Sequence, residues 1–341
     1  MSQHLHLEAE ILDLRTTHPF VIARGGQSDD RTIWVRLRDR DGLEGWGEAA
    51  ASRYYGETPE SVLSALNVYV SGMPTDPFDL EDTERRWVTT LGRNAAARAA
   101  LSAALHDLVG KRLGVPLYRL WGLDPAKAPR STFTIGLDTD ERIRAKVHEA
   151  VEYPILKVKL GTDRDRRILE TIREATDKEL RVDANGGWTV KRAIRMLPLL
   201  EEFNVTVLEQ PLPPSDLEGL AAVTRHARMP VIADESCLTV EDIPPLVGKV
   251  DGINIKLAKC GSLREALRMV AVARAHGMLV MVGCMIESSL GITAAAHLTP
   301  LVDLVDLDGA ALLSNDPFVG ATIAGGHVAL PEGPGLGVRA R

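Results

Sequence analysis

From Ser131 onward, short apolar runs alternate with longer amphipathic segments at a nearly constant interval. The apolar runs predict eight β-strands, at residues 132–135, 155–160, 180–183, 205–209, 231–234, 252–256, 279–282 and 304–306. Most of the gaps carry apolar residues at helical spacing, as in TVKRAIRMLPLLEEF and SLREALRMVAVARAHG. Strand–helix alternation with a period of about 23 to 26 residues is typical of parallel β/α units. We therefore predict an α/β fold with a (β/α)7β barrel of the TIM type, rather than an open sheet.

The first 125 residues have a different pattern. IWVRLRDRDGLEGWGEA predicts two strands joined at the Asp41-Gly42 turn. From Asn94, NAAARAALSAALHDLVGKRLG predicts a helix that stops at its last glycine. We expect an α+β domain at residues 1–125 and the barrel at residues 126–314. The Gly- and Pro-rich tail, about residues 315–341, is too irregular to add a unit and is expected to return to the first domain.

Composition excludes several classes of partner. Among the 341 residues, 40 Lys+Arg against 47 Asp+Glu give a net charge of −7, and no basic run is present. This balance argues against binding to nucleic acid or to anionic lipid. The longest apolar run, Met278 to Ile286, is too short to span a bilayer. The first residues lack the pattern of a signal peptide, and the three cysteines form no C-x-x-C pair, so we expect a cytoplasmic protein.

Ionisable residues stand at the carboxyl ends of six predicted strands. They are Lys159, Asp183, Glu209, Asp234, Lys256 and Asp306. The carboxyl ends of barrel strands meet at one mouth, where the active sites of barrel enzymes lie. A single such residue is explained equally well by a helix cap or a salt bridge. Six in register across the barrel instead favour a functional site.

Three of these residues predict a metal site. Asp183, Glu209 and Asp234 end adjacent strands, so their carboxylates are expected to converge. Without a cation they would repel one another and raise each other's pKa. An all-oxygen set without His or Cys favours Mg²⁺. A purely structural ion is the alternative, and the position at an open mouth disfavours it.

The lysines predict proton transfer. Lys157 and Lys159 are two residues apart on one strand, so their side chains share a face. Two close ammonium groups are expected to lower each other's pKa, which makes one of them a usable base. Lys256 ends the strand on the opposite side of the barrel. This arrangement suits removal of a proton from one face of a carbon and its return to the other, whereas Lys157 could instead neutralise the carboxylates.

Three further carboxylates have open alternatives. Asp306 and Asp308 repeat the two-residue spacing on the eighth strand, opposite the metal carboxylates. Together they suit a cationic group such as an α-ammonium, although Asp308 could instead cap a helix. Glu287 follows the seventh strand and either orients Lys256 or caps a helix.

These residues, in this order, resemble the enolase superfamily, in its muconate-lactonizing subgroup. The resemblance covers nearly the whole chain. It is carried by LKVKLG, RVDANGGW, LEQPLP, ADES, NIKLAKCGS and VGCMIESSLGITAAAHL. Upstream, PFVIARG, RYYGETPESV and ALHDLVGKRLGVPLYRLWG look like the capping domain of that superfamily. Within the subgroup, DLDG resembles the Asp-x-Asp motif of dipeptide epimerases.

The resemblance implies a function for the predicted site. One Mg²⁺ per subunit, held by the three metal carboxylates, would bind the carboxylate of a dipeptide and stabilise an enediolate. Lys159 and Lys256 would be the two acid/base catalysts, with Lys157 adjusting Lys159. Asp306 and Asp308 would bind the amino terminus. The implied reaction inverts the C-terminal residue of an L-Ala-L-Xaa dipeptide, in the metabolism of murein peptides, and the superfamily also implies a homo-oligomer.

Two capping-domain loops, residues 24–31 and 50–57, are expected to set the side-chain preference by closing over the mouth. An acidic side chain such as Glu is the leading choice for Xaa, because Arg suits carboxylates. The candidate substrate-binding residues are Arg24, Arg31, Arg53 and Tyr54. Gln27, Asp29 and Asp30 reduce the positive charge of these loops.

Rival functions share much of this pattern. An o-succinylbenzoate synthase, an N-acylamino acid racemase or a muconate cycloisomerase would have the same fold and lysines. Their substrates carry no ammonium for Asp306 and Asp308, which counts against them. The non-enzyme alternative is a catalytically silent barrel that binds a metabolite. Loss of a base or a metal ligand would be its expected mark, and the sequence retains all of them.

Overall fold

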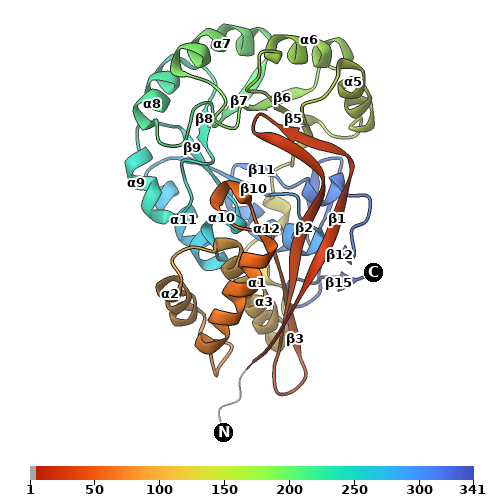
Figure 1. Cartoon of the computed structure of the whole chain (residues 1–341), viewed down its shortest axis with the longest axis vertical. Helices are drawn as coiled ribbons and strands as arrows, with labels where there is room; N and C mark the ends of the chain where they lie inside the picture. Colours follow the sequence, from red (N-terminus) through yellow and green to blue (C-terminus); the bar gives the residue numbers. More distant parts are fainter. Residues whose placement is uncertain (1–4) are drawn as a thin grey trace.

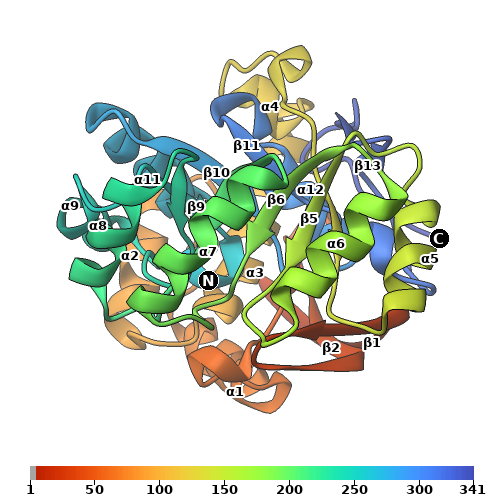
Figure 2. The same ribbon diagram turned by 90° about the horizontal axis from the view of Figure 1, so that it is seen from above.

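The computed structural model describes residues 5–341, apart from the side chains of residues 27–29. Parallel strands form an eight-stranded barrel in chain order (Figures 1 and 2). The strands are β4 (Phe133–Ile135), β5 (Ile155–Lys159), β6 (Glu179–Asp183), β7 (Val205–Glu209), β8 (Val231–Ala233), β9 (Gly252–Ile255), β10 (Leu279–Gly283) and β11 (Leu304–Asp306). A parallel bridge between Ser131 and Val305 closes the ring. The predicted barrel is thereby confirmed.

Helices follow the strands and cover the outside of the barrel (Figure 2). They are α5 (Asp140–Glu149), α6 (Asp165–Ala175), α7 (Val190–Glu202), α8 (Leu217–His226), α9 (Ile243–Leu246), α10 (Leu257–Cys260), α11 (Leu263–Ala275) and α12 (Ser289–Ala296). Their starts are set by local chemistry, since Thr139, Thr189 and Ser262 accept hydrogen bonds from the first turns of α5, α7 and α11. In the residues described, no helix is long and apolar enough to cross a membrane.

The barrel interior is apolar at its base and charged at its mouth. Val207 and Ile232 belong to a small buried cluster with Met281. Glu209 and Asp234 follow Val207 and Ile232 at a spacing of two, so each acid lies on the same face of its strand as the apolar residue. Because alternate residues of a strand share a face, the apolar side chains fill the base of the barrel and the acidic side chains lie at its mouth.

The N-terminal part forms an antiparallel sheet with helices beside it (Figure 1). The sheet contains β1 (His6–Ile22), β2 (Gly25–Arg38) and β3 (Glu44–Ala49), and the helices are α1 (Pro59–Tyr69), α2 (Leu80–Thr90), α3 (Ala95–Leu113) and α4 (Leu117–Leu120). The predicted strands around Asp41-Gly42 and the predicted helix after Asn94 are confirmed as β2, β3 and α3. The β1–β2 hairpin, which the pattern did not predict, extends to the mouth of the barrel (Figure 1).

Glycine allows β3 to pack closely on α3. A Cβ atom at Gly45 would lie 2.0 Å from the carbonyl oxygen of Ala104, and one at Gly47 would lie 2.0 Å from that of Ala100. Both distances are far inside van der Waals contact, so these two positions require glycine. Ala100 and Ala104 complete the close approach and are buried in one hydrophobic cluster with residues of β2 and β3.

The tail returns to the first part of the chain. It carries the short strands β12 (Phe318–Val319), β13 (Thr322–Ala324), β14 (His327–Ala329) and β15 (Arg339–Ala340). The ring of Phe318 packs edge-on against Trp34 at 5.1 Å, and the Leu336 amide donates to Asp107 Oδ1 at 2.7 Å. The domain boundaries near residues 125 and 314 remain a prediction.

Candidate active site

Asp183, Glu209 and Asp234 converge at the mouth of the barrel. One ligand oxygen from each lies within 4.8 Å of the others, and all three side chains are buried. The parallel register, which pairs Asp183 with Glu209, brings the strand ends level. The donor set contains only carboxylate oxygens, the ligand type that Mg²⁺ prefers. These residues therefore fit a magnesium ion.

One lysine lies on each side of the set of three carboxylates. Lys159 Nζ is 2.7 Å from Asp183 Oδ2, and Lys256 Nζ is 2.7 Å from Asp234 Oδ2. The charge of Asp234 outweighs the effect of burial and raises the pKa of Lys256 above its ordinary value. The structure thus brings the two predicted catalysts to opposite ends of one metal-binding set.

Lys157 lies at the centre of the carboxylates. Its Nζ is 2.6 Å from Glu209 Oε2, 2.6 Å from Asp306 Oδ2 and 3.2 Å from Asp183 Oδ2. Burial lowers its pKa, but these three charges raise it well above the ordinary value. The prediction that Lys157 and Lys159 lower each other's pKa is therefore wrong for Lys157, because three carboxylates outweigh one ammonium. These ion pairs agree with the alternative interpretation, in which Lys157 neutralises the carboxylates.

The carboxylates themselves titrate unequally. Burial, together with the charge of Asp183, raises the pKa of Glu209 to about 7. Burial also acts to raise the pKa of Asp183, yet Lys159 and Lys157 hold it below its ordinary value. The predicted mutual rise in pKa thus describes Glu209 and not Asp183, because the lysines are distributed unevenly around the set.

Sequence reasoning missed two residues that fix the metal-binding set. Lys259 Nζ donates to Asp234 Oδ1 at 2.5 Å and to the Asn254 carbonyl at 2.9 Å. Asn254 Nδ2 donates to Glu209 Oε1 at 2.8 Å. Spacing could have found Asn254, which stands two residues before Lys256 on the same face of β9. Lys259 follows Lys256 in the short helix α10, where a single helical turn brings it back to the site.

Asp306 and Asp308 lie across the mouth on the β11 side. Thr132 Oγ1 donates to Asp306 Oδ1, and the Thr134 amide donates to Asp308 Oδ2, both at 2.5 Å. Burial, together with the charge of Asp306, raises the pKa of Asp308 to about 7. The side chain of Asp308 does not cap the 3-10 helix η6 (Gly309–Leu312) that follows it, so the helix-cap alternative is wrong. Its carboxylate instead faces the cavity.

Glu287 does not cap α12, and the charge of Lys256 acts on it without a direct contact. Glu287 Oε1 accepts from the Met285 amide at 2.9 Å, and within residues 5–341 it forms no hydrogen bond or ion pair with Lys256. Ser288 caps α12, and Glu48 from β3 accepts from the Gly291 amide at 2.9 Å. Burial and the nearby charge of Glu48 raise the pKa of Glu287 to about 7.

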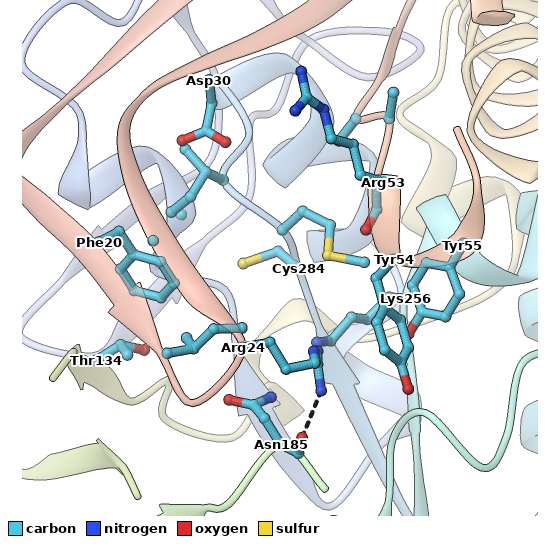
Figure 3. A pocket seen from close by; sticks show the side chains of 18 of the residues that line it. Phe20, Arg24, Asp30, Arg53, Tyr54, Tyr55, Thr134, Asn185, Lys256 and Cys284 are labelled. Atoms are coloured by element: carbon cyan, nitrogen blue, oxygen red, sulfur yellow. Dashed lines mark hydrogen bonds between the residues drawn. The ribbon is translucent and has the colours of Figure 1, made fainter. Parts of the chain in front are cut away.

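The tip of the β1–β2 hairpin and the segment after β3 cover a cavity of about 620 Å³ above these groups (Figure 3). Arg24, Arg53 and Tyr54 all line it. Arg24 Nη1 lies 2.7 Å from Glu235 Oε1 and donates to the Asn185 carbonyl at 2.6 Å. The Arg24 guanidinium also stacks 4.1 Å above the Tyr54 ring. Arg24 therefore fastens the hairpin to the barrel.

The three candidate arginines differ in their partners. Arg24 is held by Glu235, and Arg31 Nη2 lies 2.6 Å from Glu60 Oε1. Across the described chain, the guanidinium of Arg53 forms no hydrogen bond or ion pair, although it lines the cavity (Figure 3). Asp30 also lines the cavity. The side chains of Gln27 and Asp29 lie outside the described residues.

Two family models match the chain. Residues 6–122 match the N-terminal domain of mandelate racemase / muconate lactonizing enzyme, and residues 140–341 match the enolase C-terminal domain-like family. The chain belongs to the enolase superfamily. The predicted family is thereby confirmed, and its two-part organisation agrees with a barrel covered by an N-terminal α+β unit.

Relatives within the enolase superfamily match over nearly the whole length. The L-Ala-D/L-Glu epimerase of Bacteroides thetaiotaomicron is 44% identical over 96% of this chain and 85% of its own. The dipeptide epimerase of Enterococcus faecalis, solved with Mg and L-Leu-L-Tyr, has a TM-score of 0.93 at 32% identity and full coverage of both chains. The L-Ala-D/L-Glu epimerase of Bacillus subtilis has a TM-score of 0.94 at 30% identity, over 100% of this chain and 99% of its own.

Proposed function

We propose that this enolase-superfamily protein is a Mg²⁺-dependent dipeptide epimerase that inverts the α-carbon of the C-terminal residue. One observation carries the proposal. Lys159 and Lys256 lie at opposite ends of a three-carboxylate set, 2.7 Å from Asp183 and Asp234 respectively. The names of the relatives, which are epimerases of L-Ala-D/L-Glu and of other dipeptides, support the same reaction.

The chemistry requires two bases and a positive charge. When bound by Asp183, Glu209 and Asp234, Mg²⁺ supplies positive charge beside the carboxylate oxygens of the substrate. One lysine, in its neutral form, takes the α-proton, and the electron pair moves onto the carboxylate. The other lysine returns a proton to the opposite face of the carbon. Lys157 stays charged and holds the carboxylates in place.

Asp306 and Asp308 support a dipeptide over the rival substrates. Both face the cavity across from the metal carboxylates, and both are buried. An α-ammonium between them would supply the charge that a buried carboxylate needs. The substrates of o-succinylbenzoate synthase, N-acylamino acid racemase and muconate cycloisomerase carry no such cation. They would leave Asp308 without a positively charged partner.

Arg53 supports an acidic C-terminal residue. Of the three arginines considered, it alone lines the cavity without a carboxylate partner among the residues described. Its guanidinium is suited to a carboxylate. Glu is therefore the proposed C-terminal residue of the L-Ala-L-Xaa substrate, with Tyr54 and the Arg24 that it stacks on forming the adjacent wall.

We place this reaction in the metabolism of murein peptides, in a cytoplasmic homo-oligomer. The L-Ala-D/L-Glu names of the relatives support the pathway. Cys237, Cys260 and Cys284 are free thiols, which is consistent with a reducing compartment. Light scattering of the purified protein would measure the number of subunits.

The reaction itself is testable by NMR. Purified protein with MgCl₂ and L-Ala-L-Glu is expected to produce L-Ala-D-Glu until the two diastereomers reach equilibrium. EDTA should stop the reaction, and N-acetyl-L-Glu, which has no ammonium, should remain unchanged. Racemisation of N-acetyl-L-Glu without any turnover of dipeptides would show that the proposed function is wrong.

A further inference from the structure

Gln210 directly follows the metal-site residue Glu209 at the end of β7, and its side chain is completely buried. Its backbone has a φ of 35°, in the left-handed region that residues other than glycine rarely adopt. Such a conformation costs free energy, so it persists only where the surrounding structure enforces it. The contacts of Gln210 with the neighbouring strand ends supply that enforcement.

The main chain of Gln210 joins β7 to the segments on both sides. β6, β7 and β8 are neighbours in the barrel and carry the three metal carboxylates at or just beyond their ends (Figure 1). The Gly186 amide, three residues after Asp183, donates to the Gln210 carbonyl at 2.8 Å. The Gln210 amide donates at 2.8 Å to the carbonyl of Ile232, two residues before Asp234.

The side-chain amide of Gln210 holds the segment that carries Asp234. Gln210 Oε1 accepts from the Asp234 amide at 2.9 Å and from the Ser236 amide at 3.1 Å. Gln210 Nε2 donates to Ser236 Oγ and to the Leu212 carbonyl, both at 2.8 Å. Both lone pairs of the oxygen and both protons of the nitrogen are therefore used. A side chain of the same size without an amide could not replace these contacts.

Gln210 thus connects all three segments that carry the metal carboxylates. It is joined to Glu209 through the chain, to the segment after Asp183 through its carbonyl oxygen, and to Asp234 through its side chain. These contacts act on the main chain, so they set where each carboxylate begins rather than how it is charged.

Mg²⁺ requires such a fixed arrangement. It demands near-ideal octahedral geometry, whereas Ca²⁺ accepts about six to eight oxygen ligands in a flexible geometry. A ligand set whose members are fixed relative to one another therefore suits Mg²⁺. Loosening the set should weaken the binding of Mg²⁺ more than that of Ca²⁺.

We propose that Gln210 is a positioning residue that fixes the three metal carboxylates relative to one another and thereby favours Mg²⁺ over Ca²⁺. The proposal deepens the proposed function, because it rests on the Mg²⁺ site which that function requires. It does not depend on which dipeptide is the substrate.

Two variants remove the contacts in different ways. Gln210→Met keeps a side chain of similar length but loses the four hydrogen bonds of the amide. Gln210→Gly also loses them, but it adopts a positive φ without strain, so the backbone conformation is retained. Titration calorimetry on the metal-free protein, without substrate, measures Kd for Mg²⁺ and for Ca²⁺. In both variants Kd for Mg²⁺ should rise by roughly 10-fold or more, and Kd for Ca²⁺ should rise by a smaller factor.

Each variant has a matched control. Thr171→Val removes one buried hydrogen bond, from Thr171 Oγ1 to the Arg167 carbonyl within α6. Asn204→Gly replaces another left-handed residue, with a φ of 51°, at the opposite end of β7. Both controls should leave the two dissociation constants at their wild-type values, even where thermal unfolding shows a change in stability.

The outcomes separate this proposal from the proposed function. If the folded Gln210 variants bind Mg²⁺ as tightly as wild type, or lose affinity for Mg²⁺ and Ca²⁺ by the same factor, the positioning role is wrong and the proposed function stands. If the wild-type protein itself does not bind Mg²⁺, both are wrong.

Discussion

Arg24 Nη1 lies 2.7 Å from Glu235 Oε1, and this ion pair joins the tip of the β1–β2 hairpin to the mouth of the barrel. Glu235 is 1% exposed and directly follows the metal-site residue Asp234. Burial, with the charges of Asp234 and Asp183, raises the pKa of Glu235, and Arg24 opposes that rise. The pair thus holds the hairpin to a residue that lies directly beside a metal-site carboxylate.

Removing the buried partner should release the hairpin. Glu235→Ala leaves Arg24 without its carboxylate, and the loss of a charged hydrogen bond is worth roughly 2 kcal/mol. We expect faster amide hydrogen exchange in residues 20–26 and a KM for the dipeptide raised by roughly 10-fold. Exchange measured by mass spectrometry, together with steady-state kinetics, would show both effects.

The matched control is Arg85→Ala, on α2 and outside the lining of the cavity. Its ion pair with Glu81 is exposed on both sides, at 66% and 40%, so hydrogen exchange in the hairpin and KM should both change little. If Glu235→Ala left exchange in residues 20–26 at the wild-type rate, the hairpin would be held by other contacts.

Asp183→Asn should abolish tight binding of Mg²⁺. The variant removes one of three converging oxygens and also the carboxylate that Lys159 contacts. Wild-type protein should be stabilised by Mg²⁺ by about 2.7 kcal/mol at a concentration 100 times Kd. The variant should show no such stabilisation in thermal unfolding and no heat of binding in titration calorimetry. Asp177→Asn, at an exposed position between α6 and β6, is the control, and equal Mg²⁺ binding by both variants would contradict the assigned ligands.

Glu287 should make stability depend on pH. Its pKa is raised by burial from 4.5 to about 7 in the folded protein, so its carboxyl group keeps its proton to a higher pH than in the unfolded chain. Its stabilising contribution is full below about pH 4.5 and is lost as the pH rises through 7, a change of roughly 3 kcal/mol. Glu287→Gln does not titrate and can still accept from the Met285 amide.

The free energy of unfolding of Glu287→Gln, measured relative to that of wild type, should therefore increase between pH 5 and pH 8. Urea denaturation at the two pH values measures this difference. Glu332→Gln, at an exposed position in the tail, should show none. A difference that stays constant with pH would mean that Glu287 is ionised in the folded protein throughout this range.

The barrel was predictable because its strands are buried on both faces and read as short apolar runs. β1 was not, since its 17 residues are mixed in burial, and a break in register between Arg15 and Phe20 interrupts its pairing with β2. The pairing partner, not the local pattern, makes this segment a strand.

The residues of the active site also differ in how far the local sequence predicts them. Asp183 and Lys256 could be placed from sequence because each stands at a strand end. The Lys259–Asp234 contact and the Arg24–Glu235 pair join different elements of the fold, so no local spacing records them. The raised pKa of Lys157 depends on carboxylates from three other strands, and only their convergence shows that three charges outweigh one ammonium.

Proton exchange by single-lysine variants tests the two-base account most directly. Lys159→Ala and Lys256→Ala are each incubated in D₂O with Mg²⁺ and either L-Ala-L-Glu or L-Ala-D-Glu, and α-deuteration is followed by NMR. Lys191→Ala, at an exposed position on α7, is the control. Each catalytic variant should lose epimerisation by a factor on the order of 10²–10⁴. Each should still exchange the α-proton of one diastereomer, and a different one in each variant. Epimerisation near the wild-type rate by either variant, or exchange of the same diastereomer by both, would contradict the account.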